Sequence, residues 1–409
     1  MILARPLNRE PIADLELALS RMGLPSAARE YLHEKLPHLT LLLTGIGREE
    51  GVFLKGLGEH GQPPGVELFP TFISGNVLRR PGTALLTGRQ DQFARLCVSL
   101  GSHPELAGLL RAVSQAVSEP RRPPSLGFKS RELVFGARTY LMGVLNVTPD
   151  SFSDGGTFFE ASAAVAHGLA MVAAGADILD LGGESTRPGA PEISADEELA
   201  RVMPVLLALR EQTDVPLSVD TTKAVVAKEA LRSGAELIND ISGLSLDPLM
   251  AKTVAEAGAA CCVMHIQGTP RTMQERPNYE DVISEVAEGL AGGLARGLRG
   301  GIRADRMLVD PGIGFGKTPE HNLYLLRRLA ELRVLGHPVL VGTSRKAFLG
   351  ALGDARPASQ RLLGTLGSIA YVATHGSADV VRVHDVREAK ETLSVVDAIR
   401  HSRGGGNLA

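Results

Sequence analysis

Residues 216–240 have the sequence PLSVDTTKAVVAKEALRSGAELIND and contain the repeating unit on which the fold prediction rests. Pro216–Val219 is a short apolar run of the kind that forms a buried strand, Lys223–Arg232 has helical periodicity, and Glu236–Ile238 starts a second apolar run. A strand, a helix and a second strand of this kind are typical of a βα repeat with a parallel sheet.

The same alternation of apolar runs and amphipathic stretches continues from about Ala137 towards the C-terminus. Eight strand cores are predicted, at Tyr140–Leu145, Ile178–Leu181, Pro216–Val219, Glu236–Ile238, Ala260–Met264, Met307–Val309, Val339–Val341 and Val380–Val383. A closed barrel of eight βα units takes roughly 250 residues. We therefore predict an α/β fold of the TIM (β/α)8 barrel type.

Polar residues follow every predicted strand. They are Asn146, Gly182–Arg187, Asp220, Asn239 with Asp240, His265, Asp310, Ser344–Lys346, and Arg382 with His384. In a parallel α/β barrel the ligand site lies at the carboxyl ends of the strands, so these residues are expected to converge on one rim. A doubly wound open sheet is the alternative, and it would leave some of these strand ends outside any shared crevice.

The 409-residue chain is longer than one such barrel requires. Ser118–Ser130 is rich in proline and positive charge and is the best candidate for a linker. We predict a smaller α/β domain at residues 1–117 and the barrel at 131–403. In the first domain, helices are expected near Ile12–Met22, Asp91–Leu100 and Glu105–Val117, but no group of residues there predicts a function.

The overall composition favours small-molecule partners and a cytoplasmic location. The formal net charge is −3, which does not favour binding to nucleic acid or to an anionic membrane. There are three cysteines and no long apolar run of the kind that spans a membrane. We expect a soluble protein that is not exported.

The stretch Asp310–Thr318 (DPGIGFGKT) has a superficial likeness to a phosphate-binding loop. A Walker A loop needs glycine where Pro311 stands, because proline lacks the N–H that binds phosphate. The sequence therefore disfavours an NTPase.

Two of the polar strand ends also have an ordinary structural interpretation. Asp220, Thr221 and Thr222 precede a helical stretch and could cap it, and Asn239-Asp240 could form a turn. Their place in the predicted rim favours a functional role instead.

Cationic groups gather after the seventh and eighth strands, in Ser344–Lys346 and in Arg382 with His384. These positions are where such barrels often hold phosphate, which predicts an anionic ligand. His265 and the neighbouring Cys261 and Cys262 lack the spacing of a zinc site, so we interpret them as core residues.

These strand ends closely resemble those of the dihydropteroate synthases, over nearly all of residues 131–390. The stretches that carry the resemblance are Asn146–Gly156 (NVTPDSFSDGG) and Gly183–Gly189 (GESTRPG), followed in order by those around Asp220, Asn239, Asp310–Lys317, Ser344–Lys346 and Arg382–Asp385. The resemblance implies the condensation of 6-hydroxymethyl-7,8-dihydropterin diphosphate with p-aminobenzoate, which gives 7,8-dihydropteroate and diphosphate in folate biosynthesis. It also implies a homodimer formed through barrel helices.

The resemblance also implies roles for individual residues. The pterin would be bound by Asp220, Asn239, Met264, Asp310 and Lys346, the diphosphate by Asn146, Thr186, Arg382 and His384, and p-aminobenzoate by Phe152, Pro188, Phe315 and Ser344. Catalysis would rest on Asp220, Asp310, Arg187 and Lys346, with Asn146 as a ligand of Mg²⁺.

These residue types suit such a reaction. Carboxylates near the pterin methylene would stabilise the cation-like centre that forms as diphosphate leaves. An aromatic amine is neutral near pH 7 and can attack without a strong base. A pterin-dependent methyltransferase would not need the two loops in this form, and a binding protein with a dead site would leave an intact ring of polar residues idle.

Overall fold

The computed structural model describes residues 3–6, 39–60, 67–68, 84–88, 90–117, 125–148, 157–187, 189–352 and 355–402. The chain divides into two compact units, one built mainly from Met1–Arg121 and the other from Arg122–Arg333 with His337–Ala409. The domain limits expected from the sequence stay a prediction. Among the described residues, no helix is both long and apolar enough to span a membrane.

The N-terminal unit contains a four-stranded antiparallel sheet. Its strands, in spatial order, are β1 (Leu3–Pro6), β2 (Leu39–Thr44), β4 (Ala84–Gly88) and β3 (Glu67–Leu68), and its helices are α3 (Arg48–His60), α4 (Gln90–Gly101) and α5 (Ala107–Val117), the last preceded by the 3-10 turn η2 (Pro104–Leu106). The expected helices near 91–100 and 105–117 are present, whereas the helix expected near 12–22 lies outside the described residues. Leu41, Leu86, Phe93 and Leu109 belong to one buried cluster that joins sheet and helices.

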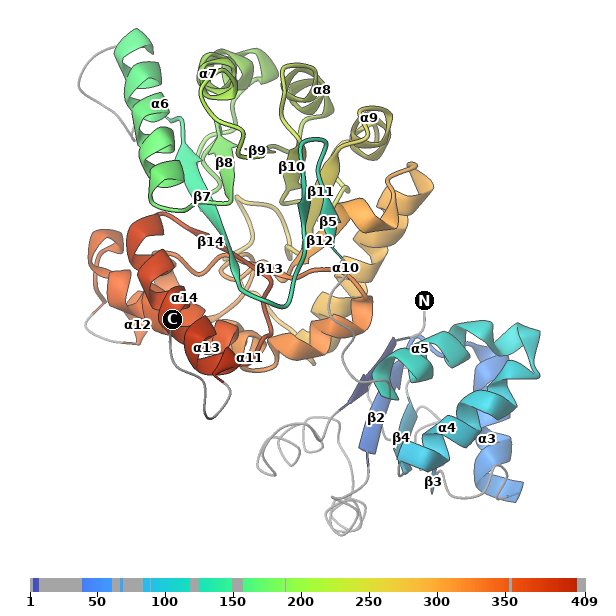
Figure 1. Cartoon of the computed structure of the whole chain (residues 1–409). Helices are drawn as coiled ribbons and strands as arrows, with labels where there is room; N and C mark the ends of the chain where they lie inside the picture. Colours follow the sequence, from blue (N-terminus) through green and yellow to red (C-terminus); the bar gives the residue numbers. More distant parts are fainter. Residues whose placement is uncertain are drawn as a thin grey trace. The chain divides into compact units, whose positions relative to one another are not determined.

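The second unit is a parallel eight-stranded barrel (Figure 1). Its strands are β7 (Tyr140–Asn146), β8 (Ile178–Gly182), β9 (Leu217–Asp220), β10 (Leu237–Asp240), β11 (Ala260–Met264), β12 (Met307–Asp310), β13 (Leu340–Val341) and β14 (Val380–Val383). Hydrogen bonds join them in the order β12-β11-β10-β9-β8-β7-β14-β13, and a parallel bridge between Val309 and Val339 closes the ring. The predicted barrel is confirmed and the open sheet is not.

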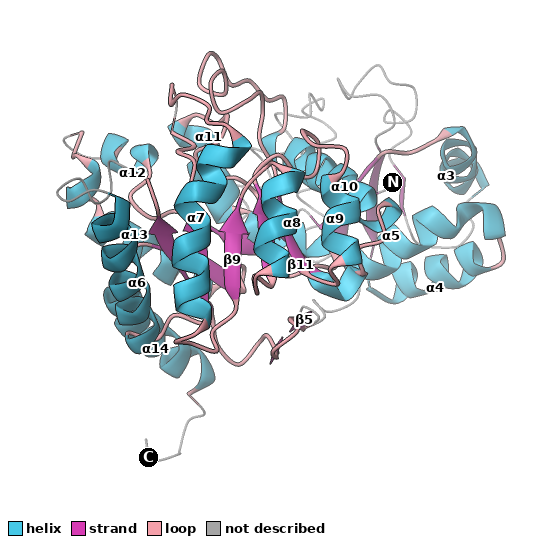
Figure 2. Ribbon diagram, turned by 90° about the horizontal axis from the view of Figure 1, so that it is seen from above, coloured by secondary structure: helices cyan, strands magenta, loops and turns pink. Residues whose placement is uncertain are grey.

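Helices surround the strands, as Figure 2 shows. They are α6 (Thr157–Ala173), α7 (Ala195–Arg210), α8 (Ala224–Arg232), α9 (Met250–Glu256), α10 (Val282–Arg299), α11 (Pro319–Arg327), α12 (Ala347–Ala351), α13 (Leu362–Thr374) and α14 (Val386–His401), with 3-10 turns η4 (Ala304–Arg306), η5 (Leu329–Leu335) and η6 (Ala358–Gln360). Val202 of α7, Val226 of α8 and Leu290 of α10 are fully buried. These three helices are amphipathic, and their apolar faces pack on the barrel.

A short hairpin closes the amino-terminal end of the barrel. It consists of β5 (Leu126–Gly127) and β6 (Glu132–Leu133), so the last residues of the segment interpreted as a linker belong to this plug. Phe128 and Phe135 bury their rings in one cluster with Ile178 and Leu237, which start their strands. Burial of each such ring stabilises the fold by about 1.5–3 kcal/mol. With this end filled, the carboxyl ends of the strands remain for a ligand.

Candidate active site at the carboxyl ends of the strands

A buried network of charged side chains lies at the centre of the rim. Arg382 of β14 donates from Nε to Asp180 Oδ2 at 2.6 Å and from Nη2 to Asp220 Oδ2 at 3.0 Å. Asp180 is fully buried, and its other oxygen accepts a hydrogen bond from Ser218 Oγ at 2.6 Å. Three strands that are far apart in the chain thus contribute to one ion-pair network.

The environment of Asp220 raises its pKa to about 7. Burial is the largest cause, and the carboxylates of Asp180, Glu198 and Asp240 add to it, while Arg382 opposes them. Asp220 therefore changes charge near neutral pH. Its side chain does not cap the following helix, since α8 begins after Lys223 without a side-chain cap.

Asn239 and Asp240 are neighbours with different tasks. Asn239 donates from Nδ2 to Asp180 at 3.0 Å, and its Oδ1 is buried with no hydrogen-bond partner among the described residues. Asp240 instead accepts hydrogen bonds from the backbone N–H groups of Ser242 at 2.8 Å and Leu244 at 3.2 Å. The turn interpretation is confirmed for Asp240. The site role of Asn239 stays a prediction, with which a carbonyl that has no partner among the described residues is consistent, since it could accept from a ligand donor.

Asp310 and Lys346 form the other side of the rim. Asp310 accepts the N–H of Gly312 at 2.7 Å, and burial raises its pKa. Burial and the charge of Arg382 lower the pKa of Lys346 to about 8, although Asp310 and Asp220 favour its charged form. The Lys346 ammonium lies 4.0 Å from the centroid of the Phe315 ring, which is a cation–π distance.

The loop after β12 is shaped by glycine and by a buried lysine. Gly312 has a φ of 67°, and a Cβ there would lie 1.9 Å from the carbonyl oxygen of His265. Lys317 is buried and lies 3.1 Å from His265 Nδ1 while it donates to the carbonyl of Phe315 at 3.0 Å. Burial lowers its pKa to about 7. The Lys317 ammonium is thus held by groups of the protein itself.

The basic residues after β13 and β14 carry less positive charge than their number in the sequence indicated. His384 Nδ1 lies 2.9 Å from Ser344 Oγ, and burial together with Arg382 and Arg345 lowers the pKa of His384 to about 3. Arg345 is paired with Asp385, with Nε 3.1 Å from Oδ2. An imidazole in this environment is neutral near pH 7, so His384 adds no positive charge to Arg382 and Lys346.

The remaining predicted site residues lie around this rim where they are described. Asn146 ends β7, Thr186 is half-buried and Arg187 is exposed. Met264 packs in one buried cluster with Phe315. Phe152 and Pro188 lie outside the described residues.

The described residues contain no group of three or more His, Cys, Asp or Glu side chains that could hold a metal ion. The candidate ligand Asn146 brings an amide oxygen to the end of β7. Mg²⁺ prefers oxygen donors and often takes only one or two from the protein, with the rest from water and substrate phosphate, so this donor fits.

The sequence interpretation missed Asp180, which organises the network. A signal was available, because a carboxylate stands inside the apolar strand ILDLG at an interior position of β8. It also missed Lys223, whose ammonium lies 2.6 Å from both Glu184 and Glu198. No local pattern marks that arrangement.

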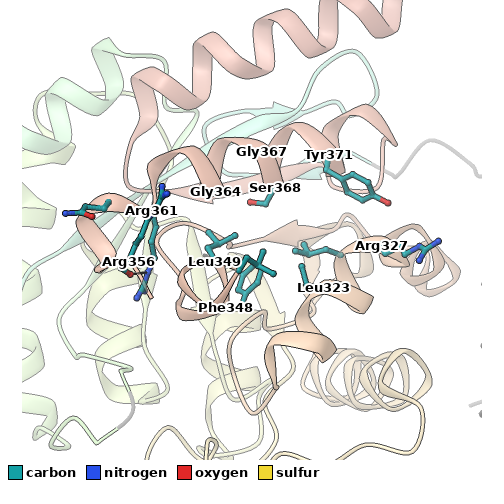
Figure 3. A pocket seen from close by; sticks show the side chains of 13 residues that line it. Leu323, Arg327, Phe348, Leu349, Arg356, Arg361, Gly364, Gly367, Ser368 and Tyr371 are labelled. Carbon is teal, nitrogen blue, oxygen red and sulfur yellow. Dashed lines mark hydrogen bonds between the residues drawn. The ribbon is translucent and has the colours of Figure 1, made fainter. Parts of the chain in front are cut away.

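A separate groove of about 710 Å³ lies between α11, α12 and α13. Figure 3 shows Leu323, Phe348 and Leu349 in it, with Tyr371 above them on α13. None of the predicted site residues lines this groove. It is therefore distinct from the rim.

Comparisons with known proteins agree with this geometry. A family described as pterin binding enzyme matches residues 142–384. The dihydropteroate synthase of Synechocystis sp. is 45% identical over 277 residues, which span 68% of this chain and 96% of that relative. The structure of Clostridium difficile dihydropteroate synthase in the presence of pteroic acid matches with a TM-score of 0.62 and 43% identity, over 66% of this chain and 99% of the other. That of Xanthomonas albilineans dihydropteroate synthase with 4-aminobenzoic acid matches with a TM-score of 0.64 and 42% identity, over 69% and 100%.

Proposed function

The chain belongs to the pterin-binding enzyme family and, within it, to the dihydropteroate synthases, and from this premise we propose how its residues divide the reaction. The reaction joins 6-hydroxymethyl-7,8-dihydropterin diphosphate to p-aminobenzoate and releases diphosphate. The observation that carries the assignment of roles is the buried Oδ1 of Asn239, which has no hydrogen-bond partner among the described residues and lies beside the Asp180–Arg382–Asp220 network.

The pterin pocket is formed by Asp220, Asn239, Asp310 and Lys346, with Met264 as an apolar wall. A pterin presents an edge of N–H donors and ring acceptors, so carboxylates and the Asn239 carbonyl accept from it and Lys346 donates to it. Support comes from their place at one rim, where Asn239, Asp310 and Met264 are buried and Asp220 and Lys346 are half-buried, and from the solved relative with pteroic acid.

The carboxylates of Asp220 and Asp310 also act on the reacting centre. As the carbon–oxygen bond to diphosphate breaks, positive charge grows on the pterin methylene, and buried negative charge nearby stabilises it. Only the ionised carboxylate of Asp220 supplies this negative charge. Because its pKa is about 7, the rate of the reaction is expected to rise as the pH approaches neutrality.

The diphosphate is held by Asn146, Thr186, Arg382 and His384, and Arg187 closes over it. His384 contributes an N–H and not a charge, since its pKa is about 3. Asn146 would hold Mg²⁺, which when bound neutralises charge on the leaving group. Arg382 keeps its charge here, because Asp180 and Asp220 raise its pKa in spite of burial.

The p-aminobenzoate ring packs on Phe315 of the rim and on Phe152 and Pro188 of the two loops, while Ser344 Oγ meets its carboxylate. The solved relative with 4-aminobenzoic acid supports this class of second substrate. Its amine attacks the methylene with its own lone pair, so no catalytic base is assigned.

The function is tested with the purified full chain, both substrates, and assays that follow dihydropteroate and diphosphate together with and without Mg²⁺. Equal amounts of both products, dependent on Mg²⁺, are expected. Diphosphate without dihydropteroate would show capture of the cation by water and would contradict the proposed p-aminobenzoate site.

We also propose a homodimer in which a second copy covers the groove between α11, α12 and α13 (Figure 3). Large apolar side chains are exposed in and beside this groove: Leu352, just after α12, at 60% and Tyr371 of α13 at 40% line it, and Leu363 of α13, next to the lining residue Gly364, is exposed at 74%. Exposed apolar surface around a groove is typical of an interface, and one two-fold axis lets it meet its own copy. Sedimentation equilibrium should give twice the chain mass, and Leu363→Glu should give the monomer.

A cytoplasmic location completes the proposal. Cys97, Cys261 and Cys262 are all free thiols, which fits a reducing compartment. Fractionation of cells with an antibody against the chain tests it.

A further inference from the structure

Lys223 joins two loops of the rim to a helix. It follows β9 by three residues, and its Nζ lies 2.6 Å from Glu184 Oε2 in the loop after β8 and 2.6 Å from Glu198 Oε2 in α7. The Glu198 side chain is fully buried and the Lys223 side chain is 19% exposed. Ammonium–carboxylate contacts of this length and burial are strong, directional links.

Glu184 extends the link through the loop that carries Thr186 and Arg187. Its Oε2 accepts from Lys223, and its Oε1 accepts the backbone N–H of Ile193 at 3.1 Å. One carboxylate thus ties the two ends of the segment 184–193 together. The described contacts place Lys223 as the external anchor of that carboxylate.

The base of the same loop is packed against α7. The carbonyl of Gly183 accepts from Arg201 Nη1 at 2.9 Å, and a Cβ on Gly183 would lie 2.7 Å from Val202 Cγ2. The loop therefore leaves the barrel from a rigid platform. Its direction beyond Gly183 depends on what holds Glu184.

Among the described residues, Lys223 supplies the one positive charge that pairs with both Glu184 and Glu198. Two carboxylates share one ammonium, and Glu198 Oε1 has no partner among the described residues. Although burial opposes it, the hydrogen bonds that Lys223 donates to both glutamates raise the pKa of Lys223. Loss of the lysine leaves a carboxylate buried without a counter-charge, which is costly.

We propose that Lys223 is a positioning residue of the reaction, which holds Glu184 and thereby sets Thr186 and Arg187 over the departing diphosphate. This inference rests on the roles proposed above for those two residues. Lys223 touches neither substrate. It acts on the step in which the loop closes, and the pterin pocket of Asn239, Asp310 and Lys346 is left in place.

A change that releases Glu184 should therefore lower kcat and leave the affinity for the pterin nearly unchanged. When Glu184 is released, the loop is no longer preorganised, and misplacement of a catalytic group by about 1 Å costs roughly a hundredfold in rate. The affinity for 6-hydroxymethyl-7,8-dihydropterin without its diphosphate should stay within about threefold, because Asn239, Asp310 and Lys346 belong to other βα units and Asp220 of β9 is held by its own hydrogen bond from Arg382.

Two variants test this without leaving an unpaired buried charge. Glu184→Gln weakens the loop arm and keeps the Lys223–Glu198 pair, and the double variant Lys223→Met with Glu198→Gln removes both buried charges together. Each is expected to lower kcat by about tenfold or more, with pterin affinity by calorimetry unchanged. Lys223→Arg, made in the otherwise natural chain, keeps a cation at this position and should retain part of the kcat that the two test variants lose. Arg232→Met, on the exposed face of α8, is the control with wild-type kinetics.

Wild-type kcat in both test variants would overturn the inference, as would a parallel loss of pterin affinity. Arg187→Ala in the same assay separates the two proposals. If Arg187→Ala lowers kcat and the two test variants do not, only the positioning role of Lys223 fails. If Arg187→Ala is as fast as the natural chain, the proposed role of the loop fails.

Discussion

Arg382 Nη2 donates to Asp220 Oδ2 at 3.0 Å, so the residue assigned to the diphosphate is bonded to a residue assigned to the pterin. Arg382 and Asp220, which are proposed to bind opposite ends of the dihydropterin diphosphate, therefore shift each other's pKa. Arg382 lowers the pKa of Asp220, while burial and three neighbouring carboxylates raise it to about 7.

Replacement of Arg382 should change the pH profile as well as the rate. In Arg382→Met the pKa of Asp220 loses the cation that lowers it, so the acid limb of kcat/KM should move to higher pH. Arg382→Lys keeps a charge and should move it less. Profiles from pH 5.5 to 9 check this, and an unmoved acid limb would remove Asp220 as the group that limits the rate.

Replacement of Asp220 should reveal its effect on stability. A carboxyl whose folded pKa is raised from 3.8 to about 7 stabilises the fold fully below pH 4, and this contribution is lost as pH rises through 7. The Asp220→Asn variant lacks that loss, so its unfolding free energy relative to wild type should rise with pH by up to about 1.4 kcal/mol per unit and level off above pH 7. Urea unfolding at pH 4.5, 6 and 8 measures it, and a difference independent of pH contradicts it.

Phe315 should govern the second substrate more than the first. Phe315→Leu removes the ring 4.0 Å from the Lys346 ammonium and the proposed wall for p-aminobenzoate. The KM for p-aminobenzoate should rise about 2- to 30-fold, equivalent to roughly 0.5–2 kcal/mol. Met273→Leu, in the same buried cluster, is the control with near-normal KM. Equal KM values for the two variants would count against the contact.

Gly312 should tolerate no side chain. In Gly312→Ala the new Cβ would meet the His265 carbonyl at 1.9 Å in a backbone with φ of 67°. We expect a loss of about 3 kcal/mol or more in unfolding free energy. Gly258→Ala shares the positive φ but has open space around it, so it should lose clearly less. Thermal unfolding of both variants decides between steric clash and backbone strain.

Much of the barrel was predictable because its signals are local. Each apolar strand core is followed by a polar residue such as Asn146, Asp220 or Asp310, and the order of these ends along the chain matches the order around the ring. The reaction was predicted from the resemblance of Asn146–Gly156 and Gly183–Gly189 to the loops of the dihydropteroate synthases.

The division of labour at the rim was less predictable. Asn239 and Asp240 are adjacent and both polar, yet the Asn239 carbonyl has no hydrogen-bond partner among the described residues and Asp240 shapes a turn. His384 looks cationic in a list of residues, but burial near Arg382 keeps it neutral. Such differences depend on which face of the strand each side chain occupies and on what lies within a few ångströms.

The amino-acid sequence by itself determined the eight βα units, the polar rim and the family, because strand period, helix period and loop motifs are properties of short segments. Only the tertiary structure decided that Asp180 joins Arg382 to Asn239, and that Lys223 joins Glu184 to Glu198. Closure of the ring brings Arg382 of β14 to Asp180 of β8, whereas the packing of two successive βα units brings Glu184 and Glu198 to Lys223. Pairing energies and pKa values depend on the distances and the burial that result.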